Sequence, residues 1–237
     1  MNIKEVIKKH VIKAFDNIAE GYRHWRARPW QEVKDLALKF FRKGIILDLG
    51  CGNGRHSYFL LKIGVEVVGL DISMGMLEAY RASVSQEELR LLSLVQGDGT
   101  MIPFREDAFD GSVCIAVLHN IPLRSNRIGF LREMRKVLKK EAVALVTVWS
   151  IMQPHLFLKA LTHYLLCRKP CFEFGDVLIP WRRKEKIIQR YYHLYTKKEL
   201  SYDISLAGLK VALLKTLGKT FYIFPRNYLI AVLKKQL

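Results

Sequence analysis

Short apolar runs alternate with stretches of helical spacing from residue 45 onward. A strand buried on both faces is a nearly continuous apolar run, whereas an amphipathic helix places apolar residues three or four positions apart. The alternation predicts an α/β fold, with a mostly parallel seven-stranded sheet flanked by helices. The expected strands are 45–49, 65–70, 91–95, 111–118, 142–149, 210–216 and 221–233. The expected helices are 55–63, 74–83, 125–138 and 199–209.

Two segments depart from this alternation. Residues 1–20 repeat an apolar position every four residues from Ile3 to Ala19, which predicts a packed amphipathic helix with a solvated lysine-rich face. Residues 151–198 are basic and aromatic, and we expect an irregular insertion after the fifth strand. A chain of 237 residues, half of them hydrophobic, can bury one sizeable core. We therefore expect one domain over 1–237, with an N-terminal helical cap in 1–40 and a substrate insertion in 151–198.

Positive charge dominates the composition. Lysine and arginine number 39 against 22 aspartate and glutamate residues, a formal net charge of +17. Such a chain is typical of proteins that bind a polyanion, most often nucleic acid, although lysine-rich surfaces also occur in heat-adapted proteins. No apolar stretch reaches the roughly 18 residues that a membrane helix needs, and the first residues do not resemble a cleavable leader. We expect a cytoplasmic protein that does not contact a membrane.

Four cysteines supply no recognisable metal site. Cys51 follows the first apolar run, Cys114 lies in the fourth, and Cys167 and Cys171 share a loop. The spacing of the last two is compatible with half of a zinc site or with a disulfide. No second pair with metal-ligand spacing accompanies them, so we expect incidental cysteines and no metal.

A glycine-rich turn follows the first predicted strand. In LDLGCGNGRH, residues 47–56, three glycines occupy alternate positions after Asp48: Gly50, Gly52 and Gly54. A strand, turn and helix of this kind brings backbone N–H groups close to a nucleotide-like ligand. The dinucleotide fingerprint requires a third glycine at position 55. Arg55 stands there and counts against NAD and FAD.

Polar residues also lie at the ends of the next three strands. Asp71 closes the second apolar run, where a carboxylate can accept both hydroxyls of a ribose. QGDGTMIPF carries Asp98 after the third run, and FDGSVCIAVLHNI forms the fourth. With the glycine turn, these motifs resemble those of the S-adenosylmethionine-dependent methyltransferases of the Rossmann-like class I. The resemblance implies that S-adenosylmethionine is held by Asp48, Gly50, Gly52, Gly54, Asp71, Ile72, Asp98, Gly99, Ala116 and Tyr22.

Three stretches outside the cofactor motifs narrow the resemblance. They are FDNIAEGYRHWRARPW from residue 15, VLHNI at the end of the fourth strand, and GDVLIPWRRKEKIIQRYYHLYTKKEL from residue 175. Together they resemble the tRNA wobble-uridine carboxyl methyltransferases, a family that includes the methyltransferase domain of human AlkB homologue eight. The resemblance implies methylation of 5-carboxymethyluridine at the wobble position of the anticodon, which gives the methyl ester. It also implies a small zinc-ribbon activator protein, bound as a heterodimer.

This chemistry indicates two catalytic candidates. A carboxylate with a pKa near 4 is already ionised at neutral pH, so attack on a sulfonium methyl group needs alignment and no general base. Arg26 carries the planar fork that matches a carboxylate, and His119, after the fourth strand, can orient the same group. Tyr22 and Trp30 are candidates for a lid over the cofactor, but aromatics at helical spacing are also typical of a core.

The segment 175–198 combines positive charge with aromatic rings. Cations suit phosphates, and aromatic faces suit the unstacked bases of an anticodon loop. The expected substrate and RNA-binding residues are Trp30, Trp181, Arg182, Arg183, Lys184, Arg190, Tyr191, Tyr192 and His193. A solvated basic loop is the alternative interpretation. A second basic run, from Arg124 to Lys140, is typical of a helix face.

Two positions depart from the family pattern. Asn120 stands where the family commonly has the second of two adjacent histidines, and Arg182 stands where it has a histidine. The roles of both stay open. The same cofactor motifs also suit a methyltransferase that acts on a small carboxylic acid or a quinone. That alternative leaves the formal net charge of +17 unexplained. A non-catalytic RNA-binding scaffold is the third hypothesis, but a scaffold does not need a complete cofactor site.

Overall fold

The main sheet of the protein has seven strands in the order β3-β2-β1-β4-β5-β9-β8. The computed structural model describes residues 12–13, 15–16, 28–166, 173–183, 186–217 and 228–235, without the side chains of residues 182, 183 and 186. The strands are β1 (Ile45–Leu49), β2 (Glu66–Asp71), β3 (Leu92–Gln96), β4 (Phe109–Ile115), β5 (Leu138–Trp149), β8 (Leu209–Leu217) and β9 (Tyr228–Lys235). The first five pair in parallel, and β9 pairs antiparallel with β5 and β8. This arrangement confirms the predicted mostly parallel sheet.

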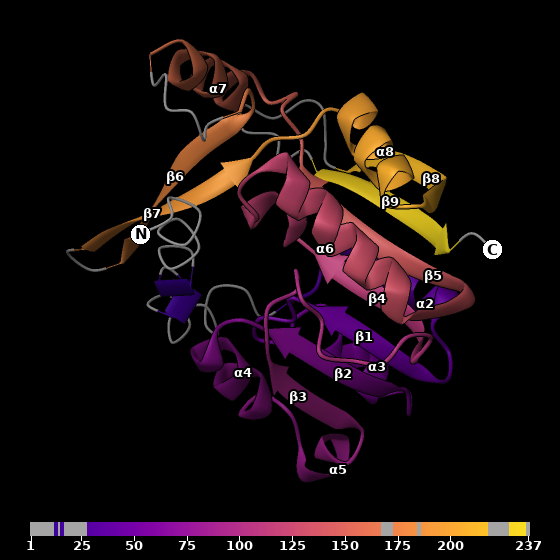
Figure 1. The fold of residues 1–237 in the computed structure, drawn as a ribbon. Coiled ribbons are helices and arrows are strands. Elements are labelled where there is room, and N and C mark those ends of the chain that lie inside the picture. Colours follow the sequence, from indigo (N-terminus) through magenta and orange to yellow (C-terminus); the bar gives the residue numbers. More distant parts are fainter. Residues whose placement is uncertain are drawn as a thin grey trace.

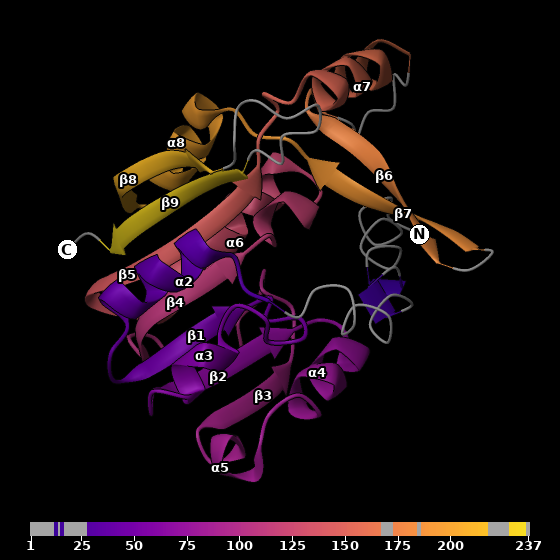
Figure 2. The same ribbon diagram turned by 180° about the vertical axis from the view of Figure 1, so that it is seen from behind.

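Helices cover both faces of this sheet (Figures 1 and 2). One face carries α6 (Arg124–Val137) and α8 (Lys197–Leu206), and the other carries α2 (Gln31–Phe40), α3 (Tyr58–Leu61) and α4 (Met74–Arg81). Leu131 of α6 and Tyr80 of α4 are fully buried in the two cores. Because both faces are covered, the central strands are mostly apolar, as in β1, where Asp48 is the one polar residue.

Side-chain caps set the start of several helices. The Ser73 hydroxyl accepts a hydrogen bond from the Met76 N–H at the start of α4. Ser85 forms a capping box with Glu88 in α5 (Gln86–Leu89). The predicted helix 55–63 is shorter than expected, since only Tyr58–Leu61 is helical and turns precede it. The bends of the glycine turn account for the difference.

The described part of the insertion has regular secondary structure, which corrects the prediction that it is irregular. It contains α7 (Pro154–Leu166) and a hairpin of β6 (Asp176–Arg183) and β7 (Lys186–His193). In this hairpin Trp181 pairs with Ile188, and both pack against Met76 of α4. Successive side chains along each hairpin strand face two different environments, so neither strand is a continuous apolar run in the sequence.

Other boundaries differ by a few residues. The fourth strand ends at Ile115, and a short 3₁₀ turn, η1 (Leu118–Asn120), follows it. Residues 12, 13, 15 and 16 are helical, as predicted, while the rest of the expected helix 1–20 and residues 221–227 of the last strand lie outside the described residues. Within the described part of the chain, no helix combines the length and apolar character needed to cross a membrane.

Candidate functional site

The glycine turn lies at the carboxyl end of β1, next to the ends of β2 and β4. Gly50 has a φ of +77°, and a Cβ there would lie 2.4 Å from Cγ2 of Val117. Gly54 has a φ of +75°, and a Cβ there would lie 2.1 Å from the Tyr80 ring. Both positions therefore require glycine, because of their left-handed backbone and because of the close contact.

A cavity of about 380 Å³ opens beside this turn, at the carboxyl edge of the parallel strands. Ligands of open α/β sheets bind at this edge. Of the predicted cofactor residues, the cavity wall includes Gly50, Gly52, Asp71, Ile72, Asp98, Gly99 and Ala116. Ile12 and Phe15 of the N-terminal segment also line it. The structure therefore brings residues from four strand ends and the N-terminal segment around one space.

Asp71 connects the second strand to the glycine turn. Its Oδ2 accepts a hydrogen bond from the Gly52 N–H at 2.8 Å, and its Oδ1 accepts one from the Ser73 N–H at 2.9 Å. Burial raises the pKa of Asp71, and the two backbone donors oppose that shift. Each carboxylate oxygen keeps a lone pair for a further donor, so Asp71 can accept two hydroxyls from a ligand.

Asp48 and Gly54 do not line the cavity. Asp48 is 2 % exposed and accepts a hydrogen bond from the Ser57 hydroxyl at 2.5 Å. The Ser57 hydroxyl also bonds the Tyr80 hydroxyl at 2.8 Å. Burial raises the pKa of Asp48 to about 7, with Asp71 adding to the shift. This corrects the prediction that Asp48 contacts the cofactor, because its side chain lies on the side of the glycine turn away from the cavity and supports the turn there.

Asp48→Asn is expected to become more stable relative to the wild type as the pH rises from about 4 to about 7. A carboxyl with a raised pKa in the folded state binds its proton there more tightly than in the unfolded chain, so ionisation costs stability. Each pH unit in this window changes the free energy of unfolding by about 1.4 kcal/mol, which sums to a difference of about 4 kcal/mol. Urea unfolding of both proteins at several pH values measures it, and a constant difference would contradict the burial argument.

The turn after β4 forms another wall of the cavity. Ala116 has a φ of +62°, and its N–H donates to the Thr147 hydroxyl at 3.0 Å. Left-handed alanine is strained, and such strain concentrates at functional sites. Asn120 lines the cavity, where its Nδ2 donates to the Ala116 carbonyl at 2.8 Å and its buried Oδ1 accepts no hydrogen bond from the described residues. Sequence reasoning did not predict Asn120 as a site residue.

His119, a predicted catalytic residue, is fully buried and does not line the cavity. Its Nδ1 accepts a hydrogen bond from the Trp149 N–H at 3.3 Å, and its ring stacks on Tyr192 with centroids 5.0 Å apart. Burial lowers the pKa of His119 to about 3, with Arg190 and His193 adding to the shift. This corrects the prediction that His119 contacts the substrate, because its imidazole ring is neutral and packed in the interior, next to Asn120 in the chain.

The N-terminal candidates are only partly described. Arg26 and Tyr22 lie outside the described residues. Trp30 is partly buried, with its ring centroid 4.0 Å from that of Tyr228 and 5.0 Å from that of His56. The Arg55 guanidinium lies 5.5 Å from the Trp30 ring, and both Arg55 and His56 line the cavity. Trp30 thus packs behind residues of the cavity wall.

The hairpin residues expected to contact RNA phosphates or to stack on RNA bases are buried. Arg190, Tyr191, Tyr192 and His193 are each less than a tenth exposed. This burial overturns the expectation that they offer open faces to an anticodon loop. Trp181 is partly buried below the Arg190 guanidinium. Arg182 and Arg183 lie in β6 with undescribed side chains, and Lys184 lies outside the described residues.

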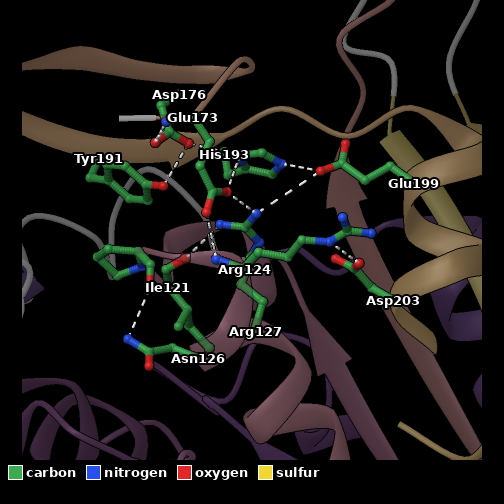
Figure 3. A network of polar contacts seen from close by, with 11 residues as sticks. Ile121, Arg124, Asn126, Arg127, Glu173, Asp176, Tyr191, His193, Glu199 and Asp203 are labelled. Atoms are coloured by element: carbon green, nitrogen blue, oxygen red, sulfur yellow. Dashed lines mark hydrogen bonds and ion pairs between the residues drawn. The ribbon is translucent and has the colours of Figure 1, made fainter. Parts of the chain in front are cut away.

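A network of charges joins the hairpin to α6 and α8 (Figure 3). His193 contacts Asp176 through Nδ1 and Glu199 through Nε2, each at 2.7 Å. Burial alone would lower the pKa of His193, but these two carboxylates outweigh it and raise the pKa. Arg127 is fully buried and donates to Glu173 at 2.6 Å. The basic run from Arg124 is helical in α6 as predicted, but Arg127 within it is buried.

The same network contains a set of residues with the geometry of metal ligands. Ligand atoms of Glu173, Asp176 and His193 lie within 4.8 Å of one another. Both His193 nitrogens already contact carboxylates, and the Arg127 guanidinium already neutralises Glu173. The raised pKa of His193 favours an imidazolium, which cannot ligate a cation. These contacts favour an ion-pair network over a metal centre.

Comparison with known proteins identifies the fold and the family of the site. The methyltransferase-domain family matches residues 47–146, from β1 into β5. A protein of Encephalitozoon cuniculi that is named as a methyltransferase is 30% identical over 205 residues, which cover 86% of this chain and 89% of that protein. The solved structure of an S-adenosylmethionine-dependent methyltransferase from Methanosarcina mazei has a TM-score of 0.73 at 20% identity and covers 89% of this chain and 99% of that one.

Two further relatives carry the name tRNA (carboxymethyluridine(34)-5-O)-methyltransferase. The protein of Schizosaccharomyces pombe is 26% identical over 226 residues, which cover 86% of this chain and 90% of that protein. The protein of Xenopus tropicalis is 25% identical over 238 residues, which cover 81% of this chain and 36% of that protein. The chain thus spans about a third of the frog relative. From the matches and the cavity together, the chain belongs to the S-adenosylmethionine-dependent methyltransferases with the Rossmann-like fold.

Proposed function

We propose that this protein methylates the carboxylate of 5-carboxymethyluridine at the wobble position of tRNA and forms the methyl ester. The observation that carries the proposal is the alignment with the Schizosaccharomyces pombe enzyme of that name over 86% of this chain and 90% of that protein. The formal net charge of +17 is consistent with a polyanionic substrate. An anticodon loop is single-stranded, so presenting its wobble base costs little compared with opening a duplex.

The polar groups of the cavity fit S-adenosylmethionine. The Asp71 carboxylate can accept the two ribose hydroxyls, and Asp98 on the next strand end can accept the adenine amino group. The unpartnered Oδ1 of Asn120 can accept from the ammonium group of the methionine part. When bound, the cofactor supplies a methyl group on a sulfonium, and the C–S electron pair stays on sulfur as the methyl passes to a carboxylate oxygen.

The tasks left to the protein are alignment and exclusion of water. The carboxylate is ionised at neutral pH, so no side chain has to remove a proton from it. Ile12, Phe15 and Phe130 give the cavity an apolar lining, which keeps water from the reacting groups. Arg26 and Tyr22 enter the proposal through the family resemblance, as a carboxylate ligand and a cofactor contact. Trp30, Trp181, Arg182, Arg183 and Lys184 stay proposed substrate contacts on the same basis.

Transfer of labelled methyl groups to tRNA is the test of this proposal. The substrates are one tRNA that carries 5-carboxymethyluridine and the same tRNA with unmodified uridine. We expect label on the first only, and release of that label by mild alkali, because esters hydrolyse and methylated bases or riboses do not. Alkali-stable label would contradict carboxyl methylation. Transfer to small carboxylic acids or quinones, with none to either tRNA, would favour the small-molecule hypothesis.

The family resemblance adds a zinc-ribbon activator to the proposal, and a cytoplasmic location stays a prediction from the sequence. The labelled-transfer experiment includes the activator as a second arm, with equal concentrations of both proteins. A rise in kcat on addition would support the heterodimer. Equal rates with and without the partner, together with no complex on gel filtration, would contradict it.

A further inference from the structure

Arg190 of β7 is a buried cation that has no acidic partner among the residues that the structure describes. It is 6 % exposed, its Nε is buried without a hydrogen bond, and no ion pair joins it to a carboxylate of the described residues. Arg127 in the charge network is also buried, but it pairs with Glu173 at 2.6 Å. Burying a charge without a counter-charge is costly, so an anion that binds Arg190 would remove an existing penalty.

Both aromatic neighbours of Arg190 adjoin the cofactor cavity. The guanidinium lies 4.7 Å from the Trp181 ring centroid and 5.1 Å from that of Tyr192. Trp181 belongs to the cluster of Met76 and Phe15, and both of these residues line the cavity. Tyr192 stacks on His119, whose neighbour in the chain, Asn120, also lines the cavity. Arg190 itself does not line the cavity; it lies behind residues of the cavity wall, and of its nitrogens only Nε is fully buried without a hydrogen bond.

The hairpin orients Arg190 through the alternation of its strands. Ile188, Arg190 and Tyr192 share one face of β7, because side chains alternate along a strand. On this face Ile188 packs against Met76, and Tyr192 stacks on His119. The opposite face carries Tyr191 and His193. Tyr191 donates to Asp176 at 2.6 Å, and His193 contacts the same carboxylate at 2.7 Å (Figure 3). The charge network therefore fixes one face of the hairpin, and the other face packs against Met76, which lines the cavity, and against His119.

We propose that Arg190 binds the carboxylate of the substrate beside the cofactor cavity, on the side where the hairpin packs against the cavity wall. This inference rests on the proposed function, since the acid it would bind is the 5-carboxymethyl group of the wobble uridine. A guanidinium matches a carboxylate with two parallel hydrogen bonds, and the flanking rings hold its plane. The carboxylate loses its negative charge as the ester forms, so Arg190 contributes more to binding than to the rate of transfer.

Substitution of Arg190 by methionine tests this role. The probes are one tRNA with 5-carboxymethyluridine at the wobble position and the same tRNA with the neutral amide, 5-carbamoylmethyluridine. A hydrogen-bonded charge of this kind predicts that the wild type binds the acid about 10- to 100-fold more tightly than the amide. Arg190→Met is expected to lower that ratio at least tenfold. Its affinity for the amide-bearing tRNA and for S-adenosylhomocysteine should stay unchanged.

Two controls accompany the variant. Arg81→Gln removes the same charge from the exposed end of α4 and should keep the wild-type ratio. Arg190→Lys keeps a cation without the planar fork and should give an intermediate ratio. The unpaired buried charge also predicts that Arg190→Met unfolds at a temperature equal to or above that of the wild type. A variant that fails to fold would contradict the proposal, because Arg190 would then be needed for the structure.

The outcomes separate this inference from the proposed function. If the wild type methylates the acid-bearing tRNA and prefers it to the amide, while Arg190→Met keeps that preference, the assignment of Arg190 is wrong and the function stands. If the wild type shows neither transfer nor preference, the proposed function itself fails. A raised KM with an unchanged kcat in Arg190→Met is the expected kinetic result, and a loss confined to kcat would contradict a binding role.

Discussion

Asp71→Ala is expected to weaken binding of S-adenosylmethionine by about 100-fold or more. The Asp71 carboxylate both holds the backbone and can bind the ligand: it accepts hydrogen bonds from the Gly52 and Ser73 N–H groups, and it can accept the ribose hydroxyls. A hydrogen bond to a charged group contributes about 1.5–3 kcal/mol, and two such bonds to the ribose correspond to a factor of about 100 or more. Calorimetric titration with the cofactor and with S-adenosylhomocysteine measures the change.

Asp35→Ala is the matched control, since Asp35 is exposed on α2 and bonds only to the neighbouring Gln31 among its described contacts. It removes the same charge and should leave cofactor affinity within twofold of the wild type. Asp71→Ala should still bind tRNA, because a carboxylate makes no favourable contact with a phosphate and its removal takes none away. Cofactor affinity within threefold of the wild type in Asp71→Ala would show that the ribose is held by other groups.

The residues around the cavity could be predicted because their positions depend on local sequence. Gly50 and Asp71 each follow an apolar run, and the carboxyl ends of parallel strands meet at one edge of the sheet. Asp48 shows the limit of this reasoning. It belongs to the same motif, but alternation along β1 turns its side chain to Ser57 and away from the cavity.

The insertion could not be predicted in the same way, because its contacts are distant in sequence. Arg127 and Arg190 both belong to basic stretches that suggest solvated or RNA-binding surfaces. Arg127 is buried because the hairpin brings Glu173 to α6, 46 positions along the chain. Arg190 is buried because the same hairpin folds toward α4 and η1. A cation that is buried by contacts so distant in sequence gives no signal in the local sequence pattern.

The buried Arg127 leads to the largest expected effect on stability. Arg127→Ala is expected to lower the free energy of unfolding by about 3–5 kcal/mol, because breaking a buried pair leaves its carboxylates without a counter-charge. Arg127 donates to Glu173 at 2.6 Å, lies 4.0 Å from Glu199, and places its guanidinium 5.6 Å from the Tyr195 ring. Urea unfolding at pH 7 measures the loss. Arg132→Ala, on the exposed side of the same helix, is the control and should cost less than about 1 kcal/mol.

A second substitution distinguishes lost charge from lost packing. Arg127→Met keeps much of the volume, so its remaining cost reports the unpaired carboxylates. Adding Glu173→Gln to Arg127→Met removes one of those charges and should restore part of the stability, whereas Glu173→Gln alone should destabilise. If the two substitutions are simply additive, the ion pair does not hold the hairpin to α6. Arg190 would then have no fixed support from the network, so the same cycle tests whether the hairpin is rigid enough to bind a substrate carboxylate.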